Sequence, residues 1–337
     1  KGVVVSYNSS TTFQDGFLRI PSIQTEYGPG NNGQYRYGGG LAGGDGKTLG
    51  GGANDFDYSI WGPKFDGRLI EQYDSPIDPA TGYRIPTPWI SRGPDNLKNF
   101  MEIGHVPSHN ISVQANTDLG SFVISNTYKN SKASTPGQRL DINTTRLRGS
   151  LNLSEKFTVD ASIQYNYQFS DNRIRGSYGP TSPLYNLAIW GGAHFDVRDF
   201  KDQLWEEGKE GIRQNFVEHW RFNNPYILAH AWKRPWTKND VISFLKFTYK
   251  FNDNFSTYLR STLNANTLTN NEEIHKDIYD YSIGDRGGRF RYNNSRYFEN
   301  NTDFLISYNQ DFFGDDFNLN ATLGGNQRYY RNHSESA

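Results

Sequence analysis

Residues 156–170 read KFTVDASIQYNYQFS, and their side chains alternate between apolar and polar. The apolar members are Phe157, Val159, Ala161, Ile163, Tyr165, Tyr167 and Phe169. Side chains of a β-strand point alternately to opposite sides, so this stretch predicts a strand with one apolar and one polar face. The alternation leaves open whether the apolar face contacts the core of a soluble protein or lipid.

The same pattern recurs along the chain. In 254–267, for example, Leu259 and Leu263 alternate with Arg260 and Asn264. Pattern and turn residues together predict nine strands, at 2–12, 107–117, 120–130, 140–153, 156–170, 238–251, 254–267, 292–311 and 315–330.

The connections between these strands alternate between short and long. The long ones are 13–106, 131–139, 171–237 and 268–291, and the others are tight turns such as the Asp118–Gly120 turn. All tight turns therefore lie at one end of the predicted sheet and all long loops at the other. Outer-membrane barrels have this asymmetry, with short periplasmic turns and long external loops, whereas a soluble β-sandwich or propeller does not require it.

Strand length and aromatic placement favour the membrane alternative. The predicted strands, of about 11 residues or more, exceed the five or six usual in soluble sheets and suffice for a tilted transmembrane strand. Tyr165, Tyr167 and Phe169 lie at the long-loop end of their strand, where an interfacial aromatic girdle is expected. We therefore predict that the apolar face contacts lipid.

Composition excludes several other classes. The 337 residues contain no cysteine, which rules out disulfides, thiolate metal sites and cysteine nucleophiles, and their net charge of −1 gives no reason to expect a nucleic-acid partner. No apolar run is long enough for a transmembrane helix. No cofactor is expected.

Nine strands is an odd number, whereas single-chain bacterial barrels have an even one. The expectation is therefore that residues 1–337 are the N-terminal portion of a larger barrel, with 13–106 and 171–237 as external loops and helical segments in the second.

The first long connection carries a motif: a Tyr-Gly-x-Gly stretch with Tyr27, Gly28 and Gly30, then Ser-x-Trp-Gly-Pro-Lys-x-Asp-Gly. The second part contains Trp61, Gly62, Pro63, Lys64, Asp66 and Gly67. This order resembles the SusC/RagA family of TonB-dependent outer-membrane transporters. The segments NLKNFMEIGHVPSHNISVQA (96–115) and SPLYNLAIWGG (182–192) are similar to that family's next helix-to-strand segment and to its helical external loop.

The resemblance implies an all-β transmembrane antiparallel barrel of 22 strands in the outer membrane of a Gram-negative bacterium, of which this sequence supplies about nine. It also implies a SusD-type lipoprotein at the external face and coupling to the TonB system through a plug absent from this sequence. The implied function is import of an oligosaccharide or peptide. The alternative is a structural or assembly subunit of an envelope complex built on the same barrel.

Several clusters contain residue types that could carry chemistry. The Gly-rich stretch 38–58 lacks the calcium-binding β-roll register, and His105 and His109 flank Pro107, which breaks any helix that would bring the two imidazoles together. Five carboxylates at Asp196, Asp199, Asp202, Glu206 and Glu207 fall on a predicted amphipathic helix with Val197, Phe200 and Leu204 as its apolar stripe. Nothing in these patterns requires an enzyme.

Two sets of residues are candidates for ligand binding. Aromatic rings stack on sugars and on peptide side chains, and five tryptophans fall in the loop 171–237: Trp190, Trp205, Trp220, Trp232 and Trp236. Their alternative role is the loop's own core or a lid interface, since Ile212, Phe216 and Trp220 keep helical spacing. The predicted lumen-facing bases, which would bind an anionic ligand or pair with plug carboxylates, are Arg146, Arg148, Lys246, Lys250 and Arg260.

Overall fold

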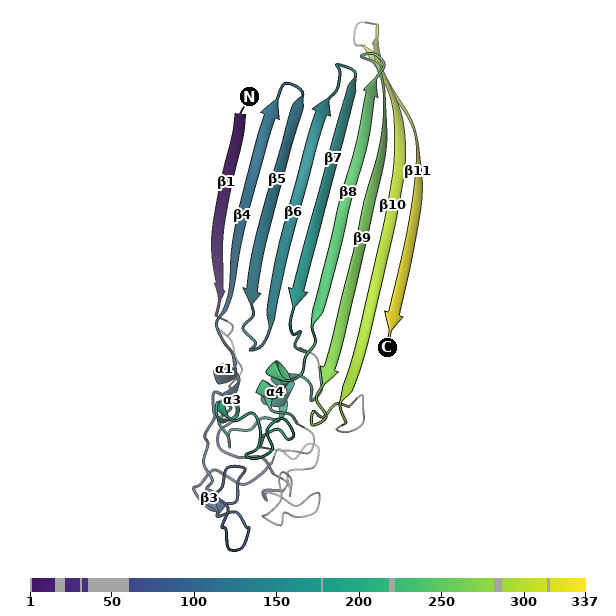
Figure 1. Cartoon of the computed structure of the whole chain (residues 1–337). Helices are drawn as coiled ribbons and strands as arrows, with labels where there is room; N and C mark the ends of the chain where they lie inside the picture. The colour runs from purple at the N-terminus through teal and green to yellow at the C-terminus, as the bar shows by residue number, and fades with distance from the viewer. Residues whose placement is uncertain are drawn as a thin grey trace.

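The computed structural model describes residues 2–15, 22–30, 32–35, 61–176, 178–217, 222–281, 287–313 and 316–337. Its main element is one antiparallel sheet of nine strands in the order β1-β4-β5-β6-β7-β8-β9-β10-β11. The strands are β1 (Gly2–Gln14), β4 (Gly104–Thr117), β5 (Gly120–Lys132), β6 (Arg139–Asn152), β7 (Phe157–Ser170), β8 (Trp236–Lys250), β9 (Phe255–Ile274), β10 (Arg289–Phe312) and β11 (Phe317–Ser336). Each strand pairs with its neighbour in the sequence of long strands, as in a meander (Figure 1).

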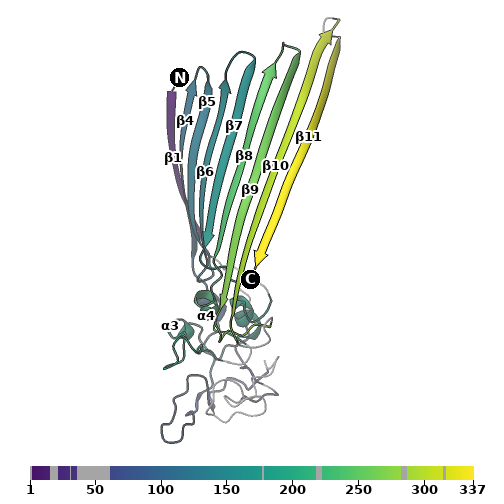
Figure 2. The same ribbon diagram turned by 45° about the vertical axis from the view of Figure 1, so that its right-hand side comes forward.

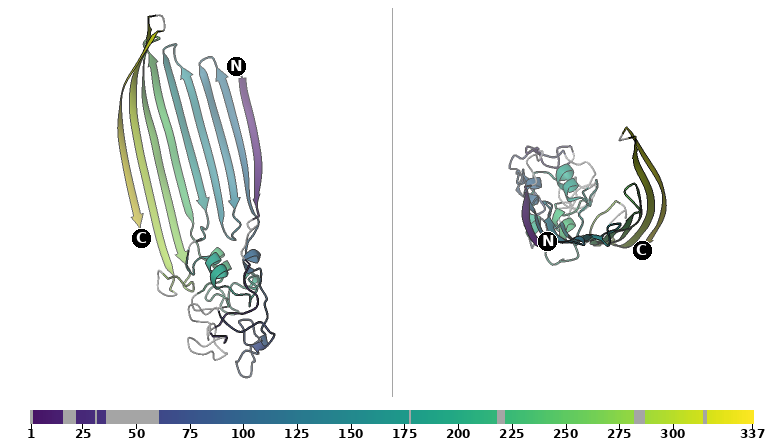
Figure 3. Two further views of the ribbon diagram at one scale, coloured as in Figure 1. Left: turned by 180° about the vertical axis from the view of Figure 1, so that it is seen from behind. Right: turned by 90° about the horizontal axis from the view of Figure 1, so that it is seen from above.

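The sheet is open and curved. Seen along the strands it follows an arc, and within the described residues β1 and β11 form its two edges without pairing to each other (Figure 3). All nine predicted strands are confirmed. The largest differences are at the loop ends of β9 and β11, which extend several residues beyond the predicted limits.

The long connections gather beyond one end of the sheet, and the tight turns lie at the other (Figures 1 and 2). The loop region contains the small strands β2 (Leu69–Ile70) and β3 (Thr87–Pro88) and the short helices α1 (Asn96–Phe100), α2 (Pro183–Tyr185), α3 (Asp199–Asp202) and α4 (Pro225–His230). A π-helical turn, η2 (Asn186–Trp190), follows α2. None of the helices in the described ranges is long and apolar enough to cross a membrane.

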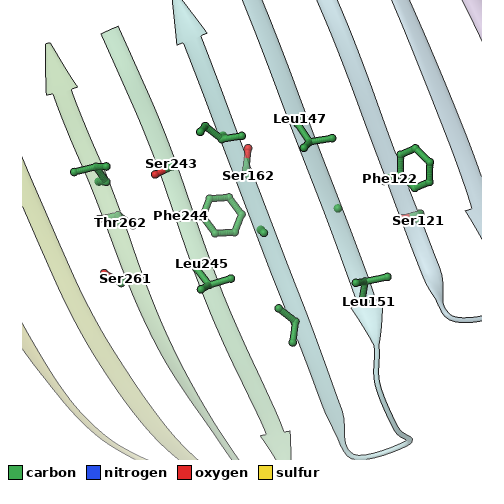
Figure 4. A pocket seen from close by; sticks show the side chains of 15 residues that line it. Ser121, Phe122, Leu147, Leu151, Ser162, Ser243, Phe244, Leu245, Ser261 and Thr262 are labelled. Atoms are coloured by element: carbon green, nitrogen blue, oxygen red, sulfur yellow. The ribbon is translucent and has the colours of Figure 1, made fainter. Parts of the chain in front are cut away.

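The strand register sorts side chains by face. Ala161 on β7 pairs with Gly149 on β6 and with Leu245 on β8, while the adjacent Asp160 pairs with Lys246. The apolar face carries many large exposed side chains, among them Ile163, and contains a shallow groove of about 590 Å³. Phe122, Leu147, Leu151 and Leu245 line this groove from β5, β6 and β8 (Figure 4). A sheet face with so much exposed apolar surface is suited to contact lipid or another protein.

The buried core of the described residues lies mainly in the loop region rather than in the sheet. Its larger cluster comprises Tyr35, Tyr73, Trp89, Phe100, Tyr185, Leu187, Phe195, Val197, Phe200, Phe216, Val217, Phe222 and Tyr226. A second cluster joins α4 to the end of β9 through Ile227, Leu228, Trp232, Ile274 and Ile278. The loops are therefore a packed cap with its own interior at one end of the sheet.

Candidate functional site at the loop end of the sheet

The two halves of the sequence motif pair with each other in the loop cap. Gly28 N–H donates to Pro63 O at 3.0 Å, Gly62 N–H donates to Gly28 O at 2.9 Å, and Trp61 N–H donates to Gly30 O at 3.0 Å. Tyr27 and Lys64 form a β-bridge, and the Tyr27 ring stacks on the Trp61 indole at 5.2 Å. The motif thus consists of two backbone segments, 27–30 and 61–64, that hydrogen bonds hold together.

Its glycines are required by close packing. A Cβ at Gly28 would lie 2.0 Å from Cζ2 of Trp89, and a Cβ at Gly62 would lie 1.8 Å from Pro29 O. Gly30 has φ +145°, which few L residues adopt. Gly28 is therefore required by the Trp89 ring, whereas Gly62 and Gly30 are required by neighbouring backbone atoms.

Trp89 is the centre of the larger cluster. The indole is fully buried and its Nε1–H donates to Pro63 O at 3.1 Å. Tyr35 and Phe65 pack against it, with ring centroids 4.6 and 5.3 Å away. Gly67, with φ +81°, donates its N–H to Trp89 O at 3.1 Å, and Asp66 accepts from Arg68, which lowers the pKa of that carboxyl to about 2.

His194 is buried in the same cluster without polar contacts. Its exposed fraction is 3%, and within the described residues neither ring nitrogen has a hydrogen-bond partner. Its ring packs against Phe195 and Trp89 at 5.1 and 5.8 Å. Burial, with a smaller contribution from the Arg92 charge, lowers the pKa of His194 to about 3, so the imidazole is neutral at physiological pH.

The predicted tryptophans occupy different environments. Trp232 is buried in the second cluster with 2% exposure, and Trp190 packs between Tyr185 and Phe222 against the larger one. Trp205 forms a β-bridge with Gln214, and its ring contacts the His275 ring edge-on, with centroids 5.1 Å apart. Trp236, at the start of β8, lines a pocket, and Trp220 lies outside the described residues.

Burial of Trp232 and packing of Trp190 agree with the alternative role, the loop's own core. The helical spacing expected at Ile212, Phe216 and Trp220 does not form a helix, because the described residues 207–217 form turns and a bridge between Trp205 and Gln214.

The five predicted bases lie on one face of the sheet by register. Arg146 faces Gln164, Arg148 faces Ser162, and Lys250 faces Ser256. Arg260 pairs with Asp303 at 3.0 Å, and Lys246 lies 4.8 Å from the ring centroid of Tyr258. Arg260 on β9 is therefore paired with a carboxylate of the neighbouring strand β10.

The acidic cluster is mostly structural. The prediction of one amphipathic helix is wrong, because only Asp199–Asp202 is helical and Val197 and Leu204 lie outside it. Val197 and Phe200 are nevertheless buried, and Leu204 packs partly buried against the same cluster. Asp199 accepts a hydrogen bond from the Tyr73 hydroxyl at 2.9 Å. Glu206 pairs with Lys209 and Arg213.

The histidine pair does not converge. His105 and His109 lie four residues apart on the extended strand β4, about 13 Å along its axis, and His109 accepts or donates to the hydroxyls of Tyr7 and Ser9. No group of residues in the described ranges could hold a metal ion. The Gly-rich stretch 38–58 lies outside the described residues.

Sequence reasoning missed the polar residues that join the loops. Asn96 Nδ2 donates to Phe195 O at 2.9 Å, and Asn224 Nδ2 donates to Asn215 O at 2.9 Å. Gln214 Nε2 donates to Asp277 O at 2.7 Å, which ties this loop to the segment after β9. Buried amides are an unusual feature, but a sequence alone does not distinguish them from exposed ones.

No family model matches the chain, and no curated protein matches it. Solved structures do. The RagAB peptide importer in its closed-closed state matches with a TM-score of 0.56 and 14% identity, over 72% of this chain and 26% of that chain. A structure of the RagAB peptide transporter matches with a TM-score of 0.53 and 15% identity, over 72% of this chain and 26% of that chain. The RagAB peptide importer in its open-open state matches with a TM-score of 0.51 and 13% identity, over 72% of this chain and 30% of that chain.

The sheet matches part of the RagA barrel. At these identities the likeness establishes the fold and no more. The chain spans between a quarter and a third of the length of the chains it matches.

Proposed function

We propose that the chain forms part of an outer-membrane importer of the SusC/RagA type, which takes up peptides or oligosaccharides in a TonB-dependent manner. The observation that carries the proposal is the match between the nine-stranded sheet and part of the RagA barrel. The exposed apolar face would contact lipid, and the polar face with Lys246 and Arg260 would line the lumen.

The loop cap supports the second part of the proposal, a SusD-type lipoprotein partner. The part of the cap that contains β3 lies far from the sheet (Figure 1). Several large apolar side chains between Trp61 and Ile90 are exposed to solvent. These are Trp61, Leu69, Ile77, Ile85 and Ile90. Exposed apolar residues gathered on one end of a protein mark an interaction surface.

A large deletion in the cap is a poor test of function, because the cap has a buried core. Deleting 183–236 would remove Tyr185, Phe195 and Tyr226 from the larger cluster and leave Trp89 and Phe100 without their neighbours. Loss of uptake in such a deletion would report unfolding of the cap as well as loss of a vestibule. Point variants on the outer surface avoid this problem.

We expect a strain lacking the gene to lose uptake of labelled peptides or oligosaccharides, and complementation to restore it. Restored uptake should stop when the proton gradient is dissipated. Ile77→Asp with Ile85→Asp should reduce co-purification of a lipoprotein, whereas Lys98→Gln on the exposed side of α1 should not. Unchanged uptake in the deletion strain, with loss of another envelope complex, would instead favour the scaffold alternative.

A further inference from the structure

A strongly basic pocket lies where the polar face of β8, β9 and β10 meets the loop cap. Its volume is about 370 Å³, and five arginines line it: Arg173, Arg175, Arg234, Arg289 and Arg291. Glu272 is the carboxylate among the lining residues, and Trp236 supplies an aromatic ring. Two loop segments far apart in sequence, before α2 and before β8, thus bring their arginines to the ends of β9 and β10.

The carboxylates are already shared by two of these arginines. Glu272 lies 3.0 Å from Arg289 and 3.4 Å from Arg234. Arg289 also contacts Asp280 at 3.2 Å. These contacts fix the floor of the pocket.

The other three arginines have no carboxylate within ion-pair distance in the described part of the chain. Arg175 Nη1 donates to the Thr181 hydroxyl at 3.3 Å, while Arg173 and Arg291 are exposed. The charges of Arg173 and Arg175 act on Arg234: burial, together with repulsion from Arg173, Arg175 and Arg289, lowers the pKa of Arg234 despite the opposing effect of Glu272. The pocket therefore carries an excess of positive charge.

One side of the pocket, at Arg234, is held in place by its neighbours. Arg234 stacks over the buried Trp232 ring at 5.4 Å, and its backbone N–H donates to Asn172 Oδ1 at 3.2 Å. Asn172 Nδ2 donates in turn to Ala229 O on α4 at 2.8 Å. A site whose charged groups are held in place loses less entropy when a ligand binds.

We propose that this pocket binds a carboxylate group of the imported ligand, so that the substrates are acidic peptides or acidic oligosaccharides. The inference rests on the proposed import function. Guanidinium groups match the two oxygens of a carboxylate, and a cavity of this size accommodates one acidic side chain or one uronate ring beside Trp236.

The test uses the intact protein in detergent and calorimetric titration with charge-matched probes. The peptide probes are acetylated and amidated triglutamate and triglutamine, and the sugar probes are trigalacturonate and its methyl ester. We expect at least one acidic probe to bind and its neutral analogue to bind much more weakly, with affinity falling as salt rises. Which acidic probe binds identifies the ligand class.

The variant R173Q/R291Q removes two arginines that hold no ion pair in the described structure. It should raise Kd for the acidic probe by about tenfold or more. The control R331Q/K98Q removes the same charge, from the opposite face of the sheet at Arg331 and from α1 at Lys98, and should leave Kd unchanged. Equal binding of acidic and neutral probes, or equal loss in both double variants, overturns the proposal.

A wild-type protein that binds neither acidic probe also overturns it, and would mean that an acidic side chain of the protein itself fills the pocket. Uptake assays separate this outcome from failure of the import function. Gradient-dependent uptake of neutral ligands without acidic binding rejects only the carboxylate site. Acidic binding without any uptake rejects import and leaves the site in place.

Discussion

His194 makes the stability of the loop cap depend on pH. Its imidazole is buried and unpartnered, with a pKa of about 3, whereas an imidazole in water has a pKa of about 6.5. The opened cap therefore binds more protons than the closed one between these values. Closure is fully stable above pH 6.5 and loses stability as the pH falls toward 3.

The magnitude follows from the two pKa values. At pH 5 an exposed imidazole is protonated, whereas His194 in the closed cap is not. Because pH 5 lies about 1.5 units below the pKa of the exposed ring, the free energy of opening the cap falls by about 2 kcal/mol. Relative to pH 7.5, the equilibrium for opening should rise by about 30-fold.

The assay is hydrogen exchange measured by mass spectrometry on peptides that cover 193–200, corrected for the intrinsic effect of pH on exchange. Protection should fall by up to about 30-fold between pH 7.5 and pH 5 in the wild-type protein. His194→Leu, which cannot titrate, should show little change. His333→Leu, at an exposed position on β11, should keep the wild-type dependence.

Two results would refute the reasoning. One is equal corrected protection of the wild-type peptides at the two pH values. The other is the same loss of protection in His194→Leu, which would assign the effect to another group in the cap.

Three further predictions concern packing and pairing. Gly28→Ala should destabilise the cap by about 2–3 kcal/mol because its Cβ would overlap Trp89, while Gly176→Ala, with open space at its Cβ, should change little in the same proteolysis assay. Asn224→Ala should cost about 2 kcal/mol, since its side chain caps α4 through Tyr226 N–H and also donates to Phe200 O; a cap as protease-resistant as wild type would contradict this. A double-mutant cycle of Arg260→Gln and Asp303→Asn should give a coupling energy of at most about 1 kcal/mol, because Arg260 is 44% exposed, and a value several times larger would show that this pair is desolvated in the assembled protein.

The sheet could be predicted from sequence because its pattern is local. Alternation at 157–169 and tight turns such as the one at Asp118 specify strand, face and pairing within a few residues. The prediction ended too early at β9, where residues 267–273 are almost all polar and carry no alternation. Pairing with β10, from Thr267 opposite Arg296 onward, continues there without an apolar face.

The cap could be predicted only in part. The short helix at Asn96–Phe100 and the helical turns after Ser182 are confirmed where the family resemblance implied them. The contacts of Trp89 with Gly28 and of Asn96 with Phe195 join residues about 60 and 100 positions apart, and no periodicity encodes them. The arginine pocket likewise arises only when the fold brings Arg173 beside Arg291.

The assignment of the two faces of the sheet is best tested by spin labels along β7. The chain has no cysteine, so single cysteines at each position from Phe157 to Phe169 can be labelled one at a time in the protein reconstituted in lipid. Labels at odd-numbered residues, on the apolar face, should be accessible to oxygen and shielded from a water-soluble nickel chelate. Labels at even-numbered residues, on the polar face, should show the reverse. Odd positions that are open to the chelate, or shielded from both reagents as in a protein core, would contradict a lipid-facing barrel wall.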